Sequence, residues 1–130
     1  MCTFNGAGAI IYDSINNKIL VVKGRDKFSL PKGHINNNEL IQSCAIREIK
    51  EETGLSIVIP KDSKTMIVND YLYYLIKIDY ASELPIIPQN TMEILFIKWL
   101  EIPTITLLIS ECNQGLRYTI KNWEIINQMF

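Results

Sequence analysis

The chain has 130 residues, with 13 basic and 14 acidic side chains and a formal net charge of −1. Its composition, 48% hydrophobic and 21% charged, is typical of a globular protein and excludes a disordered or coiled-coil chain. The length predicts a single domain over residues 1–130. The near-neutral charge gives no general attraction for polyanions, and no apolar run approaches the roughly 20 residues that cross a bilayer, so we expect no membrane association.

The three cysteines, Cys2, Cys44 and Cys112, are widely spaced and form neither a disulfide framework nor a zinc-binding pattern. The first residues lack the basic and apolar parts of a secretory signal. We therefore expect a reducing compartment, and predict that the protein is cytoplasmic.

Aliphatic and β-branched runs predict a hairpin over residues 6–13 and 18–23, then an irregular segment over 28–34. A helical pattern over residues 38–52 has candidate N-caps at Asn36, Asn37 and Asn38 and a C-cap at Gly54. Further strands are predicted over 55–59, 65–68, 71–80 and 93–100, with a turn at Asn69 and Asp70, a loop over 84–91, and closing helices over 103–110 and 116–129. Strands around one long helix predict a mixed α/β layered domain.

Two carboxylates interrupt the apolar stripe of the long helix. On a projection at 100° per residue from Ile41, Ala45 falls at about 40° and Ile49 at about 80°. Glu48 and Glu52 fall on the same side, at about −20° and 20°, where the stripe predicts apolar residues. The alternative is a solvated acidic face, but that interpretation has to explain acids on the apolar side.

Glu48 and Glu52 lie one helical turn apart and repel each other unless a cation lies between them. Magnesium prefers carboxylate and backbone oxygens and often binds substrate phosphates as well. The helix is therefore a candidate Mg²⁺ platform. Arg47 and Glu51 have the i, i+4 spacing of a salt bridge, which would orient one carboxylate.

The spacing of these residues follows a known motif. Gly33, five residues, Glu39, seven residues and then Arg47-Glu48-Ile49-Lys50-Glu51-Glu52-Thr53-Gly54-Leu55 fill every position of the Nudix box, G-x5-E-x7-R-E-U-x-E-E-x-G-U, where U is aliphatic. The chain thus resembles Nudix hydrolases. The resemblance implies an α/β/α sandwich with a mixed sheet, and a pyrophosphohydrolase that uses Mg²⁺ or Mn²⁺ to cleave a nucleoside diphosphate linked to another group.

The resemblance also implies roles for the residues of the box. Arg47 would orient the carboxylates, and Glu39 would support the loop or the site electrostatically. The implied metal ligands are Glu48, Glu52, Glu51 and the carbonyl of Gly33.

Glu93 is the candidate general base or further metal ligand outside the box. The segment from Glu93 to Trp99 resembles the E-I-x-x-I-x-W segment of mRNA-decapping Nudix enzymes, in which the glutamate is catalytic. The alternative is an exposed acid at the start of a strand.

Side chains near the box are candidates for substrate binding. Lys32 and His34 would contact phosphate, against the alternative of solvated loop residues. Phe28 would stack on a base, against the alternative of core packing. Strand tyrosines Tyr71, Tyr73 and Tyr74 have the same two alternatives.

The resemblance leaves the substrate open. Four segments along the first half of the chain resemble mRNA-decapping enzymes, so a capped-RNA substrate is expected. The last predicted helix carries only two cations, Arg117 and Lys121, and Pro31-Lys32-Gly33-His34 is also similar to dinucleoside-polyphosphate and diphosphoinositol-polyphosphate hydrolases. A phosphorylated small molecule is therefore an equal expectation, and a non-catalytic nucleotide-binding module is the alternative outside the enzymes.

Overall fold

A mixed β-sheet lies between helices in the computed structural model, which describes residues 4–87, 92–94 and 96–130. The central strand β1 (Gly6–Asp13) pairs in parallel with β6 (Tyr71–Lys77) and antiparallel with β2 (Lys18–Lys23) and β4 (Lys32–His34). The remaining strands are β3 (Phe28–Ser29) and β7 (Phe96–Glu101), which pair with β2, and β5 (Thr65–Val68), which pairs with β6. The sheet order is β3-β2-β1-β6-β5, with β4 and β7 off this path.

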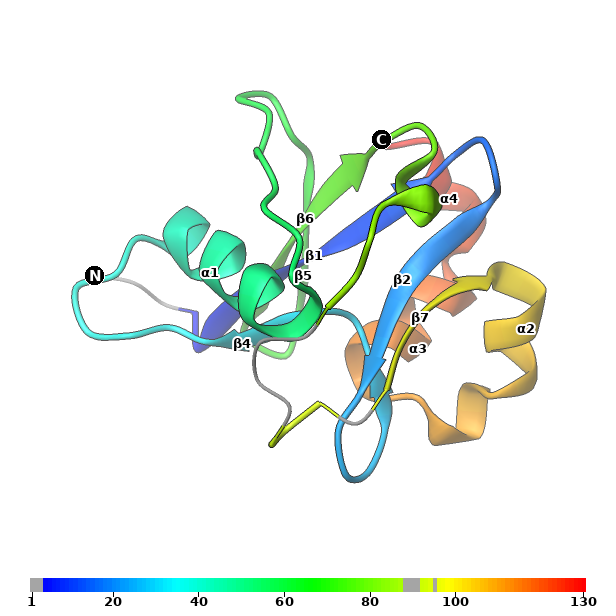
Figure 1. Cartoon of the computed structure of the whole chain (residues 1–130), viewed down its shortest axis with the longest axis horizontal. Coiled ribbons are helices and arrows are strands. Elements are labelled where there is room, and N and C mark those ends of the chain that lie inside the picture. Colours follow the sequence, from blue (N-terminus) through cyan, green and yellow to red (C-terminus); the bar gives the residue numbers. More distant parts are fainter. Residues whose placement is uncertain (1–3, 88–91, 95) are drawn as a thin grey trace.

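The helices lie on both faces of this sheet. In Figure 1, α1 (Ile41–Thr53) lies at the left, and the C-terminal helices lie to its right. These are α2 (Ile102–Leu107), α3 (Gln114–Lys121) and α4 (Trp123–Asn127), with the short 3₁₀ turn η2 (Ile109–Glu111) between α2 and α3. Another 3₁₀ turn, η1 (Ala81–Glu83), follows β6, and its Ala81 belongs to the α1 core.

The alternation of side chains along β1 builds two cores. Ala7, Ala9 and Ile11 belong to the cluster that contains Ala45 and Ile49 of α1. Ile10 and Tyr12, which point to the opposite face, belong to the cluster that contains residues of α2, α3 and α4. Both faces of the central strand are therefore covered, and the predicted α/β/α sandwich with a mixed sheet is confirmed.

The long helix forms as predicted, apart from its beginning. Gly54 is the C-cap, in the left-handed conformation with φ 79°, and its N–H donates to the Lys50 carbonyl. The predicted asparagine N-caps are wrong, because α1 begins after Leu40 and has no side-chain cap. Asn38 instead adopts a positive φ of 62°, and the Asn36 N–H donates to the Glu39 carboxylate.

The predicted strand over residues 55–59 is wrong. Leu55, Ile57 and Ile59 are buried and alternate with exposed residues, as in a strand, but no strand forms there. These side chains pack against the α1 core from an irregular segment. The alternation of buried and exposed residues therefore reflects burial of one side of this segment and not hydrogen-bonded pairing with another strand. In contrast, residues 28–34, predicted as irregular, contain the short strands β3 and β4.

The later elements form with shifted ends. Asn69 and Asp70 make the predicted turn, with φ of 50° and 65°, between the paired strands β5 and β6. The strand predicted over 71–80 ends at Lys77, that over 93–100 is β7, and the predicted last helix divides into α3 and α4. Of the predicted loop 84–91, residues 84–87 are irregular and 88–91 lie outside the described residues.

Neither described cysteine is in a disulfide; Cys44 and Cys112 are buried free thiols, and Cys2 lies outside the described residues. Among the described helices, none has the length and apolar character needed to span a membrane.

Candidate active site

Arg47 connects the carboxylates of the box. Its Nε lies 2.7 Å from Oε2 of Glu39, and its Nη1 lies 2.6 Å from Oε1 of Glu48. The predicted salt bridge to Glu51 is confirmed, at 3.3 Å. Nη2 also donates to the backbone carbonyl of His34, at 2.8 Å. One guanidinium therefore fixes the loop after β4 and two side chains of α1, which a single ammonium group cannot do.

The charges of this cluster are coupled. The hydrogen bond from Arg47 lowers the pKa of Glu39 to about 2, despite the opposing effect of burial. Glu39 therefore stays ionised at neutral pH and pairs with Arg47 from the loop before α1. This placement agrees with the supporting role predicted for Glu39.

Glu52 is held by the backbone of β4. The Lys32 N–H donates to Oε1 of Glu52 at 3.0 Å. Burial raises the pKa of Glu52 to about 8, and the nearby charges of Glu48 and Glu93 add to this effect, while the Lys32 hydrogen bond opposes it. Glu52 is thus a carboxyl group held in place by the backbone, in surroundings that disfavour its charged form.

Glu48 lies directly against the loop. A Cβ on Gly33 would overlap the Glu48 carboxylate in its present position, so glycine lets this side chain lie against the loop. Burial raises the pKa of Glu48, the Arg47 guanidinium opposes this, and the charges of Glu51 and Glu93 add to it.

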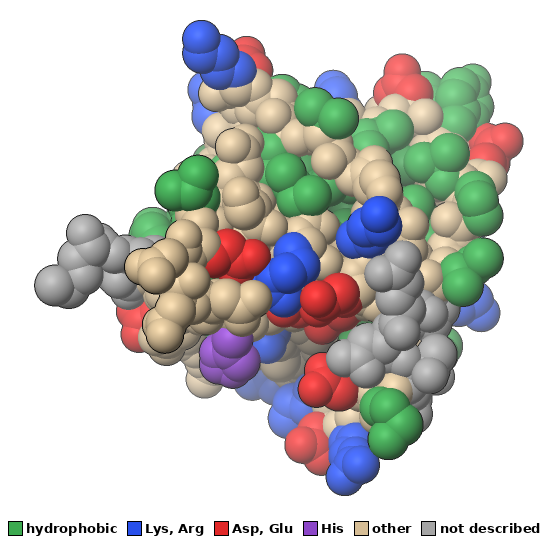
Figure 2. Space-filling model, turned by 60° about the vertical axis from the view of Figure 1, so that its left-hand side comes forward, with side chains coloured by type: hydrophobic (Ala, Val, Ile, Leu, Met, Phe, Trp, Pro, Cys, Tyr) green, Lys and Arg blue, Asp and Glu red, His purple; other side chains and the backbone are tan. Residues whose placement is uncertain are grey.

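Glu52 and Glu93 line one cavity of about 240 Å³ together with Lys32. Glu93 itself is exposed and lies in a turn before β7, so its predicted place at a strand start is wrong by three residues. Figure 2 shows acidic and cationic side chains close together on the face that carries the single histidine, His34. The structure therefore brings the residue predicted outside the box to the predicted metal platform.

Among the described residues, no three His, Cys, Asp or Glu side chains form a preformed metal cluster. The donor set nevertheless fits a hard divalent cation, because Glu48 and Glu52 supply carboxylate oxygens and their mutual repulsion is the cost that such a cation removes. The Gly33 carbonyl, a predicted ligand, lies 3.6 Å from the Cys44 thiol. Glu51, also a predicted ligand, has a half-exposed side chain beside Arg47.

Of the predicted substrate-binding residues, Lys32 and His34 lie beside Tyr71, whereas Phe28 packs on the second core. The Lys32 ammonium lies 4.6 Å from the centre of the Tyr71 ring. His34 is exposed, and its ring nitrogens lie 3.3 and 3.4 Å from the Tyr71 hydroxyl. Phe28 packs on the second core and meets Phe96 edge-on at 5.6 Å, an arrangement that favours core packing over base stacking.

Sequence reasoning missed Asn113. This residue caps α3, since its side chain accepts a hydrogen bond from the Leu116 N–H, and it lines the cavity of Glu52. An asparagine followed three residues later by an apolar residue is a typical helix start, and it places the start of α3 two residues before the predicted one.

Comparisons with known proteins agree with this geometry. The family model of the NUDIX domain matches residues 3–122. The chain is 31% identical over 121 residues to the m7GpppN-mRNA hydrolase of Saccharomyces cerevisiae, covering 88% of this chain but only 12% of the yeast protein. It is 41% identical over 61 residues to the ADP-ribose pyrophosphatase of Methanocaldococcus jannaschii, covering 41% of this chain and 34% of that protein.

The fold also resembles a solved structure, that of a binary complex of the Ap4A hydrolase of C. elegans. The TM-score is 0.71 at 21% identity, and the match covers 96% of this chain and 99% of the other. The chain therefore belongs to the Nudix family, as the motif predicts. The predicted Nudix domain is therefore confirmed, and the chain spans about an eighth of the length of the yeast relative.

Proposed function

We propose that this chain hydrolyses a pyrophosphate bond in a nucleoside diphosphate linked to another group, with Mg²⁺ or Mn²⁺ held by Glu48 and Glu52. The observation that carries the proposal is the fixed Glu52 carboxylate, which accepts the Lys32 N–H and shares a cavity with Glu93. When bound, the cation would neutralise phosphate charge and acidify the attacking water.

The other side chains of the site have separate proposed roles. Arg47 holds Glu48 in place, Lys32 presents a positive charge beside the cavity, and Glu93 accepts the proton of the attacking water at its carboxylate. Glu51 and the Gly33 carbonyl are further proposed ligands. Because Glu93 is exposed and shares the cavity with Glu52, it can reach a water molecule beside the metal platform.

The mRNA 5′ cap is the first substrate that we propose, because the yeast relative, 31% identical over 88% of this chain, is an m7GpppN-mRNA hydrolase. A dinucleoside polyphosphate or a diphosphoinositol polyphosphate is the alternative. A diphosphoinositol polyphosphate would need several cations around the cleft: Lys27 and Lys32 line the cavity of Glu52, whereas Lys23 lies over the Phe28 ring and Arg25 lines a neighbouring cavity of about 610 Å³. Cytoplasmic location stays a prediction from the sequence.

The test is a product assay with Mg²⁺ on four substrates: capped RNA, a dinucleoside tetraphosphate, a diphosphoinositol polyphosphate and a nucleotide sugar. Release of a nucleoside diphosphate from capped RNA is the expected result. Glu52→Gln should abolish turnover, whereas Glu124→Gln, an exposed change on α4, should leave it intact. Undiminished turnover by Glu52→Gln would contradict the proposed role. Substrate binding by the unaltered chain without turnover would instead support a non-catalytic nucleotide-binding module.

A further inference from the structure

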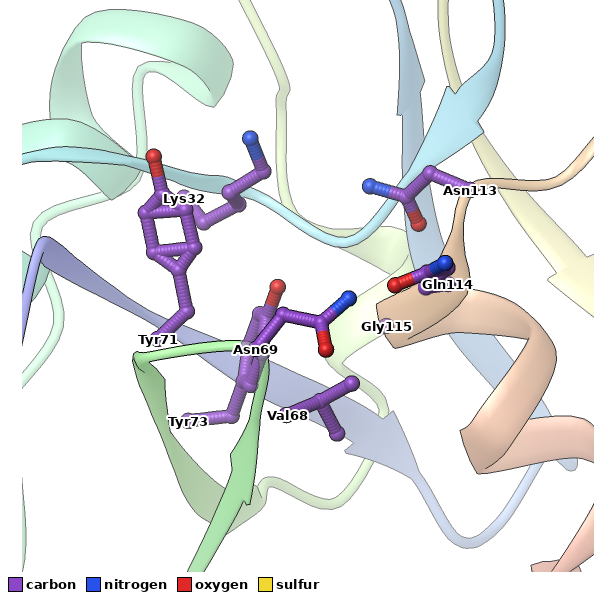
Figure 3. Close-up of a pocket in the computed structure, with 8 residues that line it drawn as sticks. All are labelled: Lys32, Val68, Asn69, Tyr71, Tyr73, Asn113, Gln114 and Gly115. Atoms are coloured by element: carbon purple, nitrogen blue, oxygen red, sulfur yellow. The ribbon is translucent and has the colours of Figure 1, made fainter.

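Lys32 lies beside two kinds of group that can hold its ammonium. Its backbone N–H donates to Oε1 of Glu52, and the residue lines the same cavity as Glu52 and Glu93. The ammonium nevertheless lies 4.6 Å from the centre of the Tyr71 ring, and Figure 3 shows the two side chains next to each other. Arg47 makes every ion pair that the described residues form at this site, and Lys32 makes none. A cation beside two carboxylates is therefore held by an aromatic face.

The Tyr71 ring contacts three other residues, which limit its movement. Tyr71 lies opposite Gly6 where β6 pairs with β1, and a Cβ on Gly6 would lie 2.8 Å from Cε1 of the ring. The hydroxyl lies 3.3 and 3.4 Å from the ring nitrogens of His34. The Tyr73 ring meets Tyr71 edge-on, with 6.5 Å between the centroids. The half-buried ring can therefore hold the Lys32 ammonium in one place.

The ammonium and the carboxylates are close enough to interact. Burial raises the pKa of Glu52, and the charge of Lys32 acts in the opposite direction. An ammonium freed from the ring can therefore pair with this carboxylate. Such a pair would occupy the oxygens that a hard divalent cation needs. A cation–π contact is about as strong as an exposed ion pair, so the ring can compete with the carboxylates for the ammonium.

We propose that Tyr71 is a positioning residue of the metal platform: its ring holds the Lys32 ammonium away from Glu52 and so keeps this carboxylate open to Mg²⁺ or Mn²⁺. The inference rests on the proposed function, because it assumes a cation at Glu48 and Glu52. Lys32 then has two separate tasks. Its backbone N–H orients the carboxylate, while its side chain is kept from neutralising it. Tyr71 acts through Lys32 and needs no contact with the metal.

The first test is Mn²⁺ binding without substrate, followed by the loss of the electron paramagnetic resonance signal of free Mn²⁺. Tyr71→Leu should raise the Kd of Mn²⁺ about fivefold, because the freed ammonium competes for Glu52. Tyr71→Phe keeps the aromatic face, so its Kd should stay within about twofold of that of the unaltered chain. Tyr118→Leu, a change at an exposed tyrosine of α3, is the matched control. Equal Mn²⁺ affinity of Tyr71→Leu and the unaltered chain would overturn the inference.

A double variant separates competition by Lys32 from a general disturbance of β6. Once Lys32→Gln has removed the ammonium, Tyr71→Leu should cause no further change in Mn²⁺ affinity, because no cation is left to compete. A loss of the same size in both backgrounds would mean that Tyr71 supports the platform by packing alone, and the inference would be wrong. Absence of Mn²⁺ binding in the unaltered chain would contradict the proposed function and the inference with it. Binding that does not depend on Tyr71 contradicts the inference alone.

The second test measures the position of the ammonium without metal or turnover. Reductive ¹³C-methylation keeps the charge of each lysine, and the Tyr71 ring current should shift the Lys32 methyl resonance upfield of those of lysines in solvent. Lys23, which lies 4.7 Å from the centre of the Phe28 ring, is an internal reference for such a shift. Lys32→Gln identifies the Lys32 resonance by its loss. Tyr71→Leu should return this resonance to the ordinary position, whereas Tyr71→Phe should not. An unshifted Lys32 resonance in the unaltered chain would show that the ring does not hold the ammonium, contrary to the inference.

Discussion

Nη1 of Arg47 lies 2.6 Å from Oε1 of Glu48, although the two residues are neighbours in the chain. Neighbouring residues on a helix point about 100° apart, so the contact requires the long Arg47 side chain to cross the face of α1. It does so because Glu39 and the His34 carbonyl hold the other guanidinium nitrogens from the loop. The orientation of Glu48 is therefore set from outside α1.

Replacement of Arg47 by lysine should lower kcat/KM about 10- to 100-fold, the usual cost of losing a residue that orients metal ligands. Lysine keeps the positive charge but cannot contact Glu39 and Glu48 with two directed N–H groups. The measurement is kcat/KM as a function of Mg²⁺ concentration, with an increased Mg²⁺ requirement as the specific signature. Lys50→Gln, an exposed change on the same helix, is the control. An unaltered Mg²⁺ requirement in the lysine variant would show that Arg47 has no positioning role.

Asp13 is a second buried carboxylate with a structural role. Its oxygens accept hydrogen bonds from the N–H groups of Ile15, Asn16, Tyr80 and Ser82, at 2.9–3.2 Å, which join the β1–β2 turn to η1. Burial opposes its ionisation, but the hydrogen bonds from Ser82 and Asn16 outweigh this and lower the pKa of Asp13.

Asp13→Asn should therefore destabilise the fold by about 2 kcal/mol at pH 7, because charged acceptors are replaced by an amide. A lowered folded-state pKa gives stability that is present above the unfolded-state pKa and is lost as the pH falls below it. The stability difference between the two proteins should thus shrink below about pH 4. Urea unfolding at pH 7 and pH 3 measures it, with Asp62→Asn as the exposed control. An equal difference at both pH values would contradict the argument.

The sequence predicts the Nudix helix well because its signal is local. The spacing of Glu48 and Glu52, the Gly54 cap and the apolar stripe all lie within one element, and each has its predicted place in α1. The sandwich also follows from the pattern, since strand runs such as 6–13 and 18–23 match β1 and β2 residue for residue.

Long-range relationships were harder to predict from the sequence. Leu55, Ile57 and Ile59 alternate like a strand, yet burial against α1 alone produces the same alternation. Lys32 was predicted from the motif, but its backbone bond to Glu52 depends on the pairing of β4 with β1. The contact between Lys32 and Tyr71 joins β4 to β6, and no sequence spacing relates two side chains that meet only in the folded chain.

Thr53 closes the helix directly after Glu52. Its buried hydroxyl donates to the Ile49 carbonyl at 2.6 Å and accepts the Leu55 N–H at 3.2 Å. Thr53→Val keeps the shape but leaves the Leu55 N–H unpaired, so the free energy of unfolding should fall by about 1–2 kcal/mol. Thermal or urea unfolding measures the change, and Thr104→Val, at an exposed position, is the control. Equal stability of Thr53→Val and the unaltered protein would show that Leu55 finds another acceptor.

Cys44 lies beneath the Arg47 cluster, fully buried, with its thiol 3.6 Å from the Gly33 carbonyl. Burial raises the pKa of Cys44 to about 11, and the charges of Glu39 and Glu48 add to this effect against the opposing influence of an Ala7 backbone hydrogen bond and the Arg47 charge. At pH 8 the thiolate fraction should therefore be about 100-fold lower than for an exposed cysteine, before steric protection is counted. Mass-spectrometric mapping of iodoacetamide labelling should show slow modification of Cys44 in the folded protein and rapid modification in urea. Fast labelling of Cys44 without denaturant would mean that α1 opens readily from β4, and the Glu48 carboxylate would then not be held against Gly33 as the proposed metal platform requires.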